Sequence, residues 1–101
     1  MIYRIFQIKD IAKTDYAFCS WAKAKCSFNF NDYKLVYISR IERILNPNLT
    51  TIEQLLEGLF YIFNVNPPAH FKGHSLSMSD IVEIGDKRYY CDIMGWKEIE
   101  I

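Results

Sequence analysis

The sequence lacks an excess of charge of either sign. Its 101 residues hold twelve Lys and Arg and twelve Asp and Glu, so the formal net charge is zero. A protein that binds duplex nucleic acid or an anionic membrane usually carries surplus Lys and Arg, because counterion release supplies much of its affinity. A protein that mimics DNA needs the opposite surplus. The composition argues against both classes, although it leaves room for a local patch of charge.

Cysteine is scarce and long apolar runs are absent. Cys19, Cys26 and Cys91 fit no zinc-finger spacing, and three thiols cannot all form disulfides within one chain. The N-terminal region shows no secretory segment, and the longest apolar stretch, residues 59–63, is far too short to cross a bilayer. We therefore expect a reduced cytoplasmic protein that does not associate with membranes.

Aromatic residues, in contrast, are abundant. Phe, Tyr and Trp make up 16% of the chain, and seven of them are Tyr. Each buries about 150–250 Å² when packed, so few are needed to build the core of a small domain. Most are expected in that core, and the surplus raises the hypothesis of an exposed aromatic face that binds a protein. The chain length fits one domain over residues 1–101.

The first half of the chain predicts two strands and a short helix. Residues 2–8 are β-branched and aromatic in both alternating sets, which is typical of a strand covered on both faces. Thr14 or Asp15 can cap a helix over residues 16–25. Residues 33–38 have high β-propensity and predict a second strand. Residues 40–48 fit either one helical turn or a loop over the sheet.

The clearest predicted element is a helix that begins in the middle of the chain. Thr50 and Glu53 have the spacing of a capping box, and Asn64 followed by Pro67 and Pro68 marks the end. An apolar residue recurs every three or four positions, which predicts a helix that packs on the sheet. The residues of this apolar face are Ile52, Leu55, Leu56, Leu59, Phe60 and Phe63.

The last third predicts an antiparallel meander. Residues 75–79 alternate serine with Leu76 and Met78, which favours an edge strand with three hydroxyls on one face, and Asp80 is expected to accept backbone amides of the loop. Strands over 80–84 and 88–92 flank a hairpin turn, and Gly95 marks a second turn before 96–101. The prediction is a single α+β domain with a mostly antiparallel sheet, a C-terminal three-strand meander and two packed helices.

Few residues suggest catalysis, a metal or a cofactor. Cys91, His74 and Asp80 can be imagined as a nucleophile, base and orienting acid, but Cys91 lies in the middle of a predicted strand, where a buried, inert thiol is the better interpretation. His70 and His74 have metal-ligand spacing only on a helix, whereas Gly73 and the preceding prolines predict a loop. No glycine-rich phosphate loop is present. We therefore expect no enzymatic activity, no metal and no cofactor.

Two stretches of the sequence carry a family resemblance. Residues 63–82 read FNVNPPAHFKGHSLSMSDIV, and the later strand reads YYCD, followed by Gly95 and Trp96. Together with the strands over 3–7 and 33–37, these stretches resemble the YodL-like family over most of the chain, although Trp96 stands where the family more often has Phe. The resemblance implies no catalytic residue. It suggests a binding role for Phe71, Gly73, His74, Ser75, Ser77, Ser79, Asp80, Tyr90, Asp92 and Trp96, unless the polar residues are simply what the fold requires.

The resemblance implies a genetic context more than an activity, namely the conjugative elements and phages of low-GC Gram-positive bacteria, beside antirestriction proteins. The leading hypothesis is a non-enzymatic, protein-binding accessory factor of such an element, one that antagonises a host defence system such as CRISPR or restriction. Its partner would be a host protein or one encoded by the element.

Two other hypotheses remain open at the level of sequence. The first is a nucleic-acid-associated module that acts in conjugative DNA transfer, with a local basic patch formed by Lys23, Lys25, Lys34, Arg40 and Arg43. The second is self-association through the strand over 33–38 or the one over 96–101. The sequence does not decide the oligomeric state.

Overall fold

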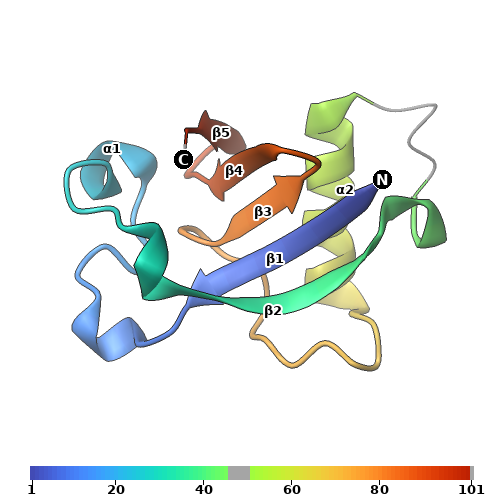
Figure 1. Cartoon of the computed structure of the whole chain (residues 1–101), viewed down its shortest axis with the longest axis horizontal. Helices are drawn as coiled ribbons and strands as arrows, with labels where there is room; N and C mark the ends of the chain where they lie inside the picture. The colour runs from blue at the N-terminus through green and yellow to red at the C-terminus, as the bar shows by residue number, and fades with distance from the viewer. Residues whose placement is uncertain (46–50, 101) are drawn as a thin grey trace.

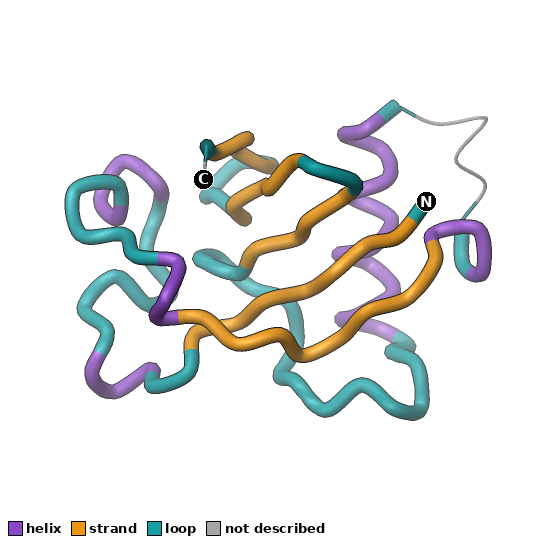
Figure 2. Tube along the Cα trace, in the orientation of Figure 1, coloured by secondary structure: helices purple, strands orange, loops and turns teal. Residues whose placement is uncertain are grey.

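Five antiparallel strands form one sheet, and a long helix crosses one of its faces (Figure 1). The structure is a computed structural model that describes residues 1–45 and 51–100. The order across the sheet is β2-β1-β3-β4-β5, so β2 and β5 are its edges (Figure 2). The predicted α+β fold with a C-terminal three-strand meander is confirmed. Its elements are β1 (Ile2–Ile8), α1 (Trp21–Ala24), β2 (Tyr33–Arg40), α2 (Ile52–Val65), β3 (Ile81–Ile84), β4 (Lys87–Cys91) and β5 (Trp96–Ile99).

β1 lies inside the sheet, and its side chains alternate between the two faces. Tyr3 and Ile5 belong to the core beneath α2, whereas Phe6 and Ile8 pack on the opposite face. The prediction of a strand over 2–8 that is covered on both faces is confirmed. A bulge shifts the register with β2 between Ile5 and Phe6, and it leaves Val36 as the extra residue of β2.

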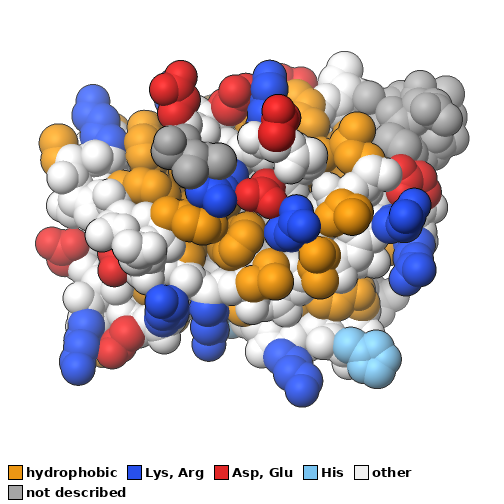
Figure 3. All heavy atoms as spheres, in the orientation of Figure 1, with side chains coloured by type: hydrophobic (Ala, Val, Ile, Leu, Met, Phe, Trp, Pro, Cys, Tyr) orange, Lys and Arg blue, Asp and Glu red, His pale blue; other side chains and the backbone are white. Residues whose placement is uncertain are grey.

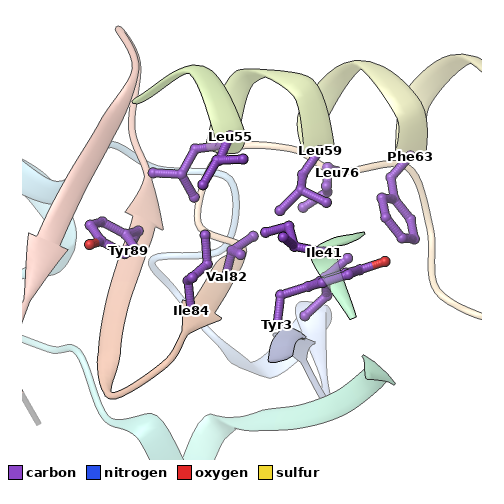
Figure 4. Close-up of a cluster of buried hydrophobic side chains, with 11 residues drawn as sticks. Tyr3, Ile41, Leu55, Leu59, Phe63, Leu76, Val82, Ile84 and Tyr89 are labelled. Atoms are coloured by element: carbon purple, nitrogen blue, oxygen red, sulfur yellow. The ribbon is translucent and has the colours of Figure 1, made fainter. Parts of the chain in front are cut away.

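α2 packs its apolar face on the sheet, as predicted (Figure 4). Its buried residues are Leu55, Leu56, Leu59 and Phe63. The capping box, however, lies one residue later than the predicted pair. The Thr51 hydroxyl accepts the Gln54 amide at 3.3 Å, and the Gln54 side-chain oxygen accepts the Thr51 amide at 3.0 Å. The prediction of Thr50 with Glu53 is wrong because the neutral amide of Gln54 serves in place of a carboxylate, and Thr50 itself lies outside the described residues.

The segment between β1 and β2 covers one end of the opposite face. The predicted helix over 16–25 shortens to Trp21–Ala24, because backbone groups that a longer helix would use internally are bonded to the C-terminal part of the chain. The Trp21 amide donates to Asp92 Oδ1 at 3.0 Å, and the Tyr90 hydroxyl donates to the Cys19 carbonyl at 2.7 Å. Phe18 has a φ of 62°, which no α-helix allows.

The serine row before β3 is a loop, so the prediction of an edge strand over 75–79 is wrong. Leu76 is buried and Ser75 is exposed, as expected, but Ser79 turns inward with a φ of 81° and is 1% exposed. The three hydroxyls therefore do not share one face. This inward turn brings Ser79 and Asp80 into register with the end of β4, where the Ser79 amide donates to the Cys91 carbonyl at 2.9 Å.

The turns of the meander agree with the sequence. Gly85 has a φ of 63° in the turn between β3 and β4, and Gly95 has a φ of 83° before β5. The ambiguous stretch over 40–48 begins with a short 3-10 helix, Ile41–Arg43, that buries Ile41 completely, whereas residues 46–48 lie outside the described part. Among the helices of the described residues, none has the length and apolar character needed to cross a bilayer.

Candidate functional site

The loop before β3 is built around one buried carboxylate, that of Asp80. Asp80 Oδ2 accepts the Ser77 amide at 2.9 Å and the Gln7 side-chain amide at 3.0 Å. The same Gln7 nitrogen donates to the His74 carbonyl at 2.8 Å, and Gln7 Oε1 accepts the His74 amide at 3.2 Å. The prediction that Asp80 holds the loop by accepting backbone amides is confirmed, and Gln7 of β1 ties both ends of the loop to the sheet.

Burial controls the charge of this carboxyl group. Asp80 is 1% exposed, and the loss of solvation raises its pKa to about 7, against the lowering effects of the Ser77 amide, the His74 charge and Gln7. His74 Nε2 lies 4.0 Å from Asp80 Oδ1. His74 Nδ1 lies 2.7 Å from the Ser75 carbonyl, which accepts hydrogen bonds only, so Nδ1 carries the proton. The carboxyl group of Asp80, which holds the loop by hydrogen bonds, therefore gains or loses its proton near neutral pH.

Gly73 and Phe71 have packing roles in this loop. A Cβ on Gly73 would overlap Gln7 Oε1 and lie 2.9 Å from Phe71 Cζ, so only glycine fits between them. The Phe71 ring meets the Phe63 ring of α2 edge-on at 4.8 Å between centroids. Burial and hydrogen bonding therefore account for the polar motif as a scaffold, in which the exposed side chains of His74 and Ser75 are the parts open to solvent.

Tyr90 and Asp92, at the end of β4, form hydrogen bonds with the backbone of α1 and of the residues just before it. Tyr90 is fully buried, and its hydroxyl donates to the Cys19 carbonyl. Asp92 Oδ1 accepts the Trp21 amide at 3.0 Å and the Ile93 amide at 2.8 Å. These bonds hold Trp21 edge-on to the Tyr90 ring, 5.0 Å between centroids. Asp92 therefore shapes the turn that follows it.

A groove of about 320 Å³ lies between α2 and the turn from β4 to β5. Phe60 of α2 and Trp96 of β5 meet edge-on at 6.4 Å between centroids and give the groove an aromatic wall. The remaining lining residues are Glu57, Met78, Cys91, Asp92, Ile93 and Gly95. Asp92 and Trp96 are thus the motif residues that reach an open surface together.

The rim of this groove is apolar and acidic. Ile93 is 71% exposed, and Met94 beside it on the turn is 90% exposed. Single exposed apolar side chains are ordinary, whereas adjacent ones beside an aromatic wall form the kind of contiguous apolar surface that is typical of a binding site. Glu57 and Asp92 line the groove, and no Lys or Arg is among its lining residues. The groove therefore fits a partner segment that combines apolar and basic side chains.

The structure brings the ten predicted site residues together in two places. Phe71, Gly73, His74, Ser75, Ser77, Ser79 and Asp80 form the loop, whereas Tyr90, Asp92 and Trp96 lie at the end of the meander. Sequence reasoning missed Gln7, Phe60 and the pair Ile93 and Met94. Gln7 could have been found as the polar exception in the alternating apolar set of β1. Ile93 and Met94 could have been found as apolar residues inside a predicted turn.

The imagined catalytic trio does not form a reactive site. Cys91 is 5% exposed, and burial raises the pKa of its thiol to about 12, so the thiolate needed for attack is scarce. In the described residues, no hydrogen bond joins this thiol to His74. His70 and His74 both lie in the loop, and no group of three or more His, Cys, Asp or Glu residues in the described ranges could hold a metal ion.

A second cleft, of about 290 Å³, has three lysines and one acidic residue, Asp10, in its lining. Lys9, Lys34 and Lys72 surround it together with His74, and the Phe18 ring lies 5.9 Å from the His74 ring. The basic patch predicted from the sequence does not coincide with this cleft. Its residues are spread over α1 and the position after it (Lys23, Lys25), β2 (Lys34, Arg40) and the short helix after β2 (Arg43), and α1 and that short helix lie at opposite ends of the molecule (Figure 1). Of that patch, only Lys34 lines the cleft.

The comparisons with known proteins support the resemblance seen in the motifs. Neither the curated proteins nor the solved structures gave a match. The family model described as the YodL-like domain matches residues 2–101, which is essentially the whole chain. It therefore includes the loop around Asp80, the groove and the sheet that carries both. The chain belongs to the YodL-like family.

Proposed function

We propose that this protein is a non-enzymatic, protein-binding accessory factor that binds a segment of its partner in the groove between α2 and the turn from β4 to β5. The observation that carries the proposal is the adjacent exposure of Ile93 and Met94 beside the aromatic wall of Phe60 and Trp96. Buried aromatic and apolar anchors dominate the affinity of protein interfaces. Glu57 and Asp92 add an acidic lining that selects basic side chains in the partner.

The genetic context belongs to the same proposal. A phage or conjugative element that enters a bacterium gains from a small factor that binds and blocks a host defence protein, as in CRISPR or restriction. Membership of the YodL-like family supports this context. The three free cysteines support a reducing cytoplasm as the place of binding.

The experiment is affinity capture from a Gram-positive lysate with matched variants. The wild-type protein, the double variant Ile93→Ser/Met94→Ser and the control Val65→Ser, which alters a side chain 62% exposed at the end of α2, are compared with and without nuclease. Salt of roughly 0.1 and 0.5 M brackets the range in which surface charges are screened. We expect one stoichiometric protein with the wild type and the control, in the presence of nuclease, and its loss with the double variant. Equal recovery by the double variant would contradict the proposal.

A second candidate function is nucleic-acid association, which the lysine cleft favours. Lys9, Lys34 and Lys72 can neutralise phosphates, and Phe18 beside His74 offers a ring on which a base can stack. This function predicts binding of a single-stranded oligonucleotide that weakens steeply as salt rises. The double variant Lys34→Ser/Lys72→Ser should abolish the mobility shift, whereas Lys23→Ser/Lys25→Ser on and beside α1 should leave it unchanged. A flat salt response would reject this candidate.

A further inference from the structure

The two edges of the sheet differ in how they are protected. β5 has four residues, two of which, Lys97 and Glu98, are charged and exposed. Short length and charge are the devices that keep an edge strand from pairing with another chain. β2 has eight residues, and its charges, Lys34 and Arg40, lie near its ends. The middle of β2 is therefore an unguarded edge.

The outer side of β2 has free main-chain groups. Within the described parts of the chain, the Tyr33 amide donates to the Phe30 carbonyl, and no main-chain hydrogen bond joins residues 34–40 to any segment other than β1. Leu35 and Ile38 are each 48% exposed on this strand. Figure 3 views the sheet from the side away from α2 and shows hydrophobic side chains across the middle of that face, with acidic and basic side chains among and around them. Such an edge is suited to a further strand with apolar side chains.

Because of the bulge, the order in which the residues of β2 point to the two faces of the sheet is the same when it is read from either end of the strand. Leu35 and Ile38 pair in β1 with Phe6 and Arg4, so they lie on the face away from α2. Val36 and Tyr37, in contrast, both pack against the core beneath α2. Counted from this central pair toward either end of β2, the first residue lies on the face away from α2, the second on the face toward α2, and the third on the face away from it again. A strand with this property can pair with a copy of itself without moving any side chain to the wrong face.

We propose that β2 pairs with β2 of a second copy of this chain, antiparallel, across a two-fold axis that passes between Val36 and Tyr37. The two sheets then form one continuous sheet, and the grooves stay free because they lie toward the opposite edge of each sheet. The dimer would present two grooves to its partners. The proposal does not depend on what those grooves bind.

Side-chain chemistry selects this register. Leu35 lies opposite Ile38 of the second copy, twice by symmetry, and Lys34 lies opposite Ser39. Every residue then faces one from the same side of the sheet. A shift by one residue would place Lys34 opposite Arg40 and Leu35 opposite Ser39, and the two members of each pair would then lie on different faces of the sheet. The proposed register keeps both members of every pair on one face and places the apolar residues Leu35 and Ile38 opposite each other.

Mass measurement tests the dimer. Light scattering during size-exclusion chromatography, over a series of concentrations, should give twice the chain mass of 12.0 kDa for the wild type. Ile38→Lys should give the monomer mass, and the control Ile93→Lys, which places the same charge on an apolar side chain of the other edge region, should stay dimeric. Circular dichroism checks that both variants fold. A monomeric wild type at every concentration, or an Ile38→Lys variant as dimeric as the wild type, would overturn the proposal.

Cross-linking tests the register. In a Cys26→Ser background, which removes the exposed thiol, Lys34→Cys/Ser39→Cys should form a covalent dimer under mild oxidation. Each single variant should remain uncrosslinked, because its new thiol lies opposite Ser39 or Lys34 and not a second thiol. A dimer by mass in which the double variant does not cross-link would show that the copies meet elsewhere and would also overturn the proposal.

Discussion

Replacing Asp80 by Asn should remove a pH dependence from the stability of this fold. Asp80 Oδ2 accepts hydrogen bonds from Gln7 and from the Ser77 amide, and the oxygen of an Asn side chain can accept both. The Asn nitrogen would then take the place of Oδ1, the oxygen that lies 4.0 Å from His74 Nε2. Asp80→Asn thus copies the protonated carboxyl group in shape and hydrogen bonding.

The size and sign of the effect follow from the pKa of Asp80. Burial raises this pKa from the ordinary value of 3.8 to about 7. Between these two values the folded chain keeps a proton that the unfolded chain has lost, so the free energy of unfolding falls as the pH rises. A shift of about three units, at about 1.4 kcal/mol for each unit, gives a loss of at most about 4 kcal/mol. His74, Tyr33 and Cys91 share this environment, but Asn removes the titration of Asp80 alone.

Urea unfolding at several pH values between about 4 and 8 measures this difference. We expect the wild type and Asp80→Asn to be nearly equal in stability at the acidic end, and the variant to gain progressively as the pH approaches 7. Asp80→Ala should be less stable than Asp80→Asn at every pH, by about 2–4 kcal/mol, because it leaves two buried donors without an acceptor. Parallel pH profiles for the wild type and Asp80→Asn would refute the reasoning.

Three further predictions concern the packing around the same loop and the accessibility of two thiols. Gly73→Ala should lower the free energy of unfolding by about 1–3 kcal/mol in urea titration, because the new methyl group overlaps Gln7, whose hydrogen bonds hold it in place; a stability equal to that of the wild type would contradict this. Tyr33→Phe should cost about 1–2 kcal/mol by the same assay, since the Tyr33 hydroxyl donates a buried hydrogen bond of 2.6 Å to the Ser79 carbonyl, and an unchanged midpoint would count against that bond. With a thiol reagent near neutral pH, exposed Cys26 should react quickly and Cys91 only after unfolding; rapid labelling of Cys91 in the native protein would show that the end of β4 opens.

The parts of the fold that are stabilised by local pattern could be predicted from the sequence. Alternation in residues 2–8 and the 3.6-residue period of α2 each specify one face to bury, and the glycines at 85 and 95 supply the positive φ that their turns need. Each of these signals lies within a few residues of the element that it specifies.

The parts that depend on contacts distant in sequence could not be predicted. The helix over 16–25 was expected from its apolar spacing, but Ser79, Tyr90 and Asp92 take hydrogen bonds of its backbone from more than sixty residues away. The serine row likewise does not alternate as a strand, because its backbone folds around the buried carboxylate of Asp80 and forms a hydrogen bond with it. No local pattern shows where such tertiary hydrogen bonds will form.

The candidate site divides in the same way. The motif pointed to Asp92 and Trp96, which line the groove, but also to a loop that works as a scaffold. Phe60 was expected only as part of the helix face against the sheet, since its contact with Trp96 joins residues distant in the chain. The exposure of Ile93 and Met94 depends on the direction in which the turn between β4 and β5 projects from the sheet. Composition alone could not predict that exposure.

Amide chemical shifts test the central claim most directly, because they report on every surface of the protein at once. The captured partner is added to isotope-labelled protein, and the shifts of the backbone amides are followed residue by residue. The account predicts that the largest changes fall around the groove, at Glu57, Phe60 and residues 92–96, while the amides of the lysine cleft at Lys9 and Lys72 stay in place. Changes centred on the lysine cleft or on β2, with the groove unaffected, would contradict it.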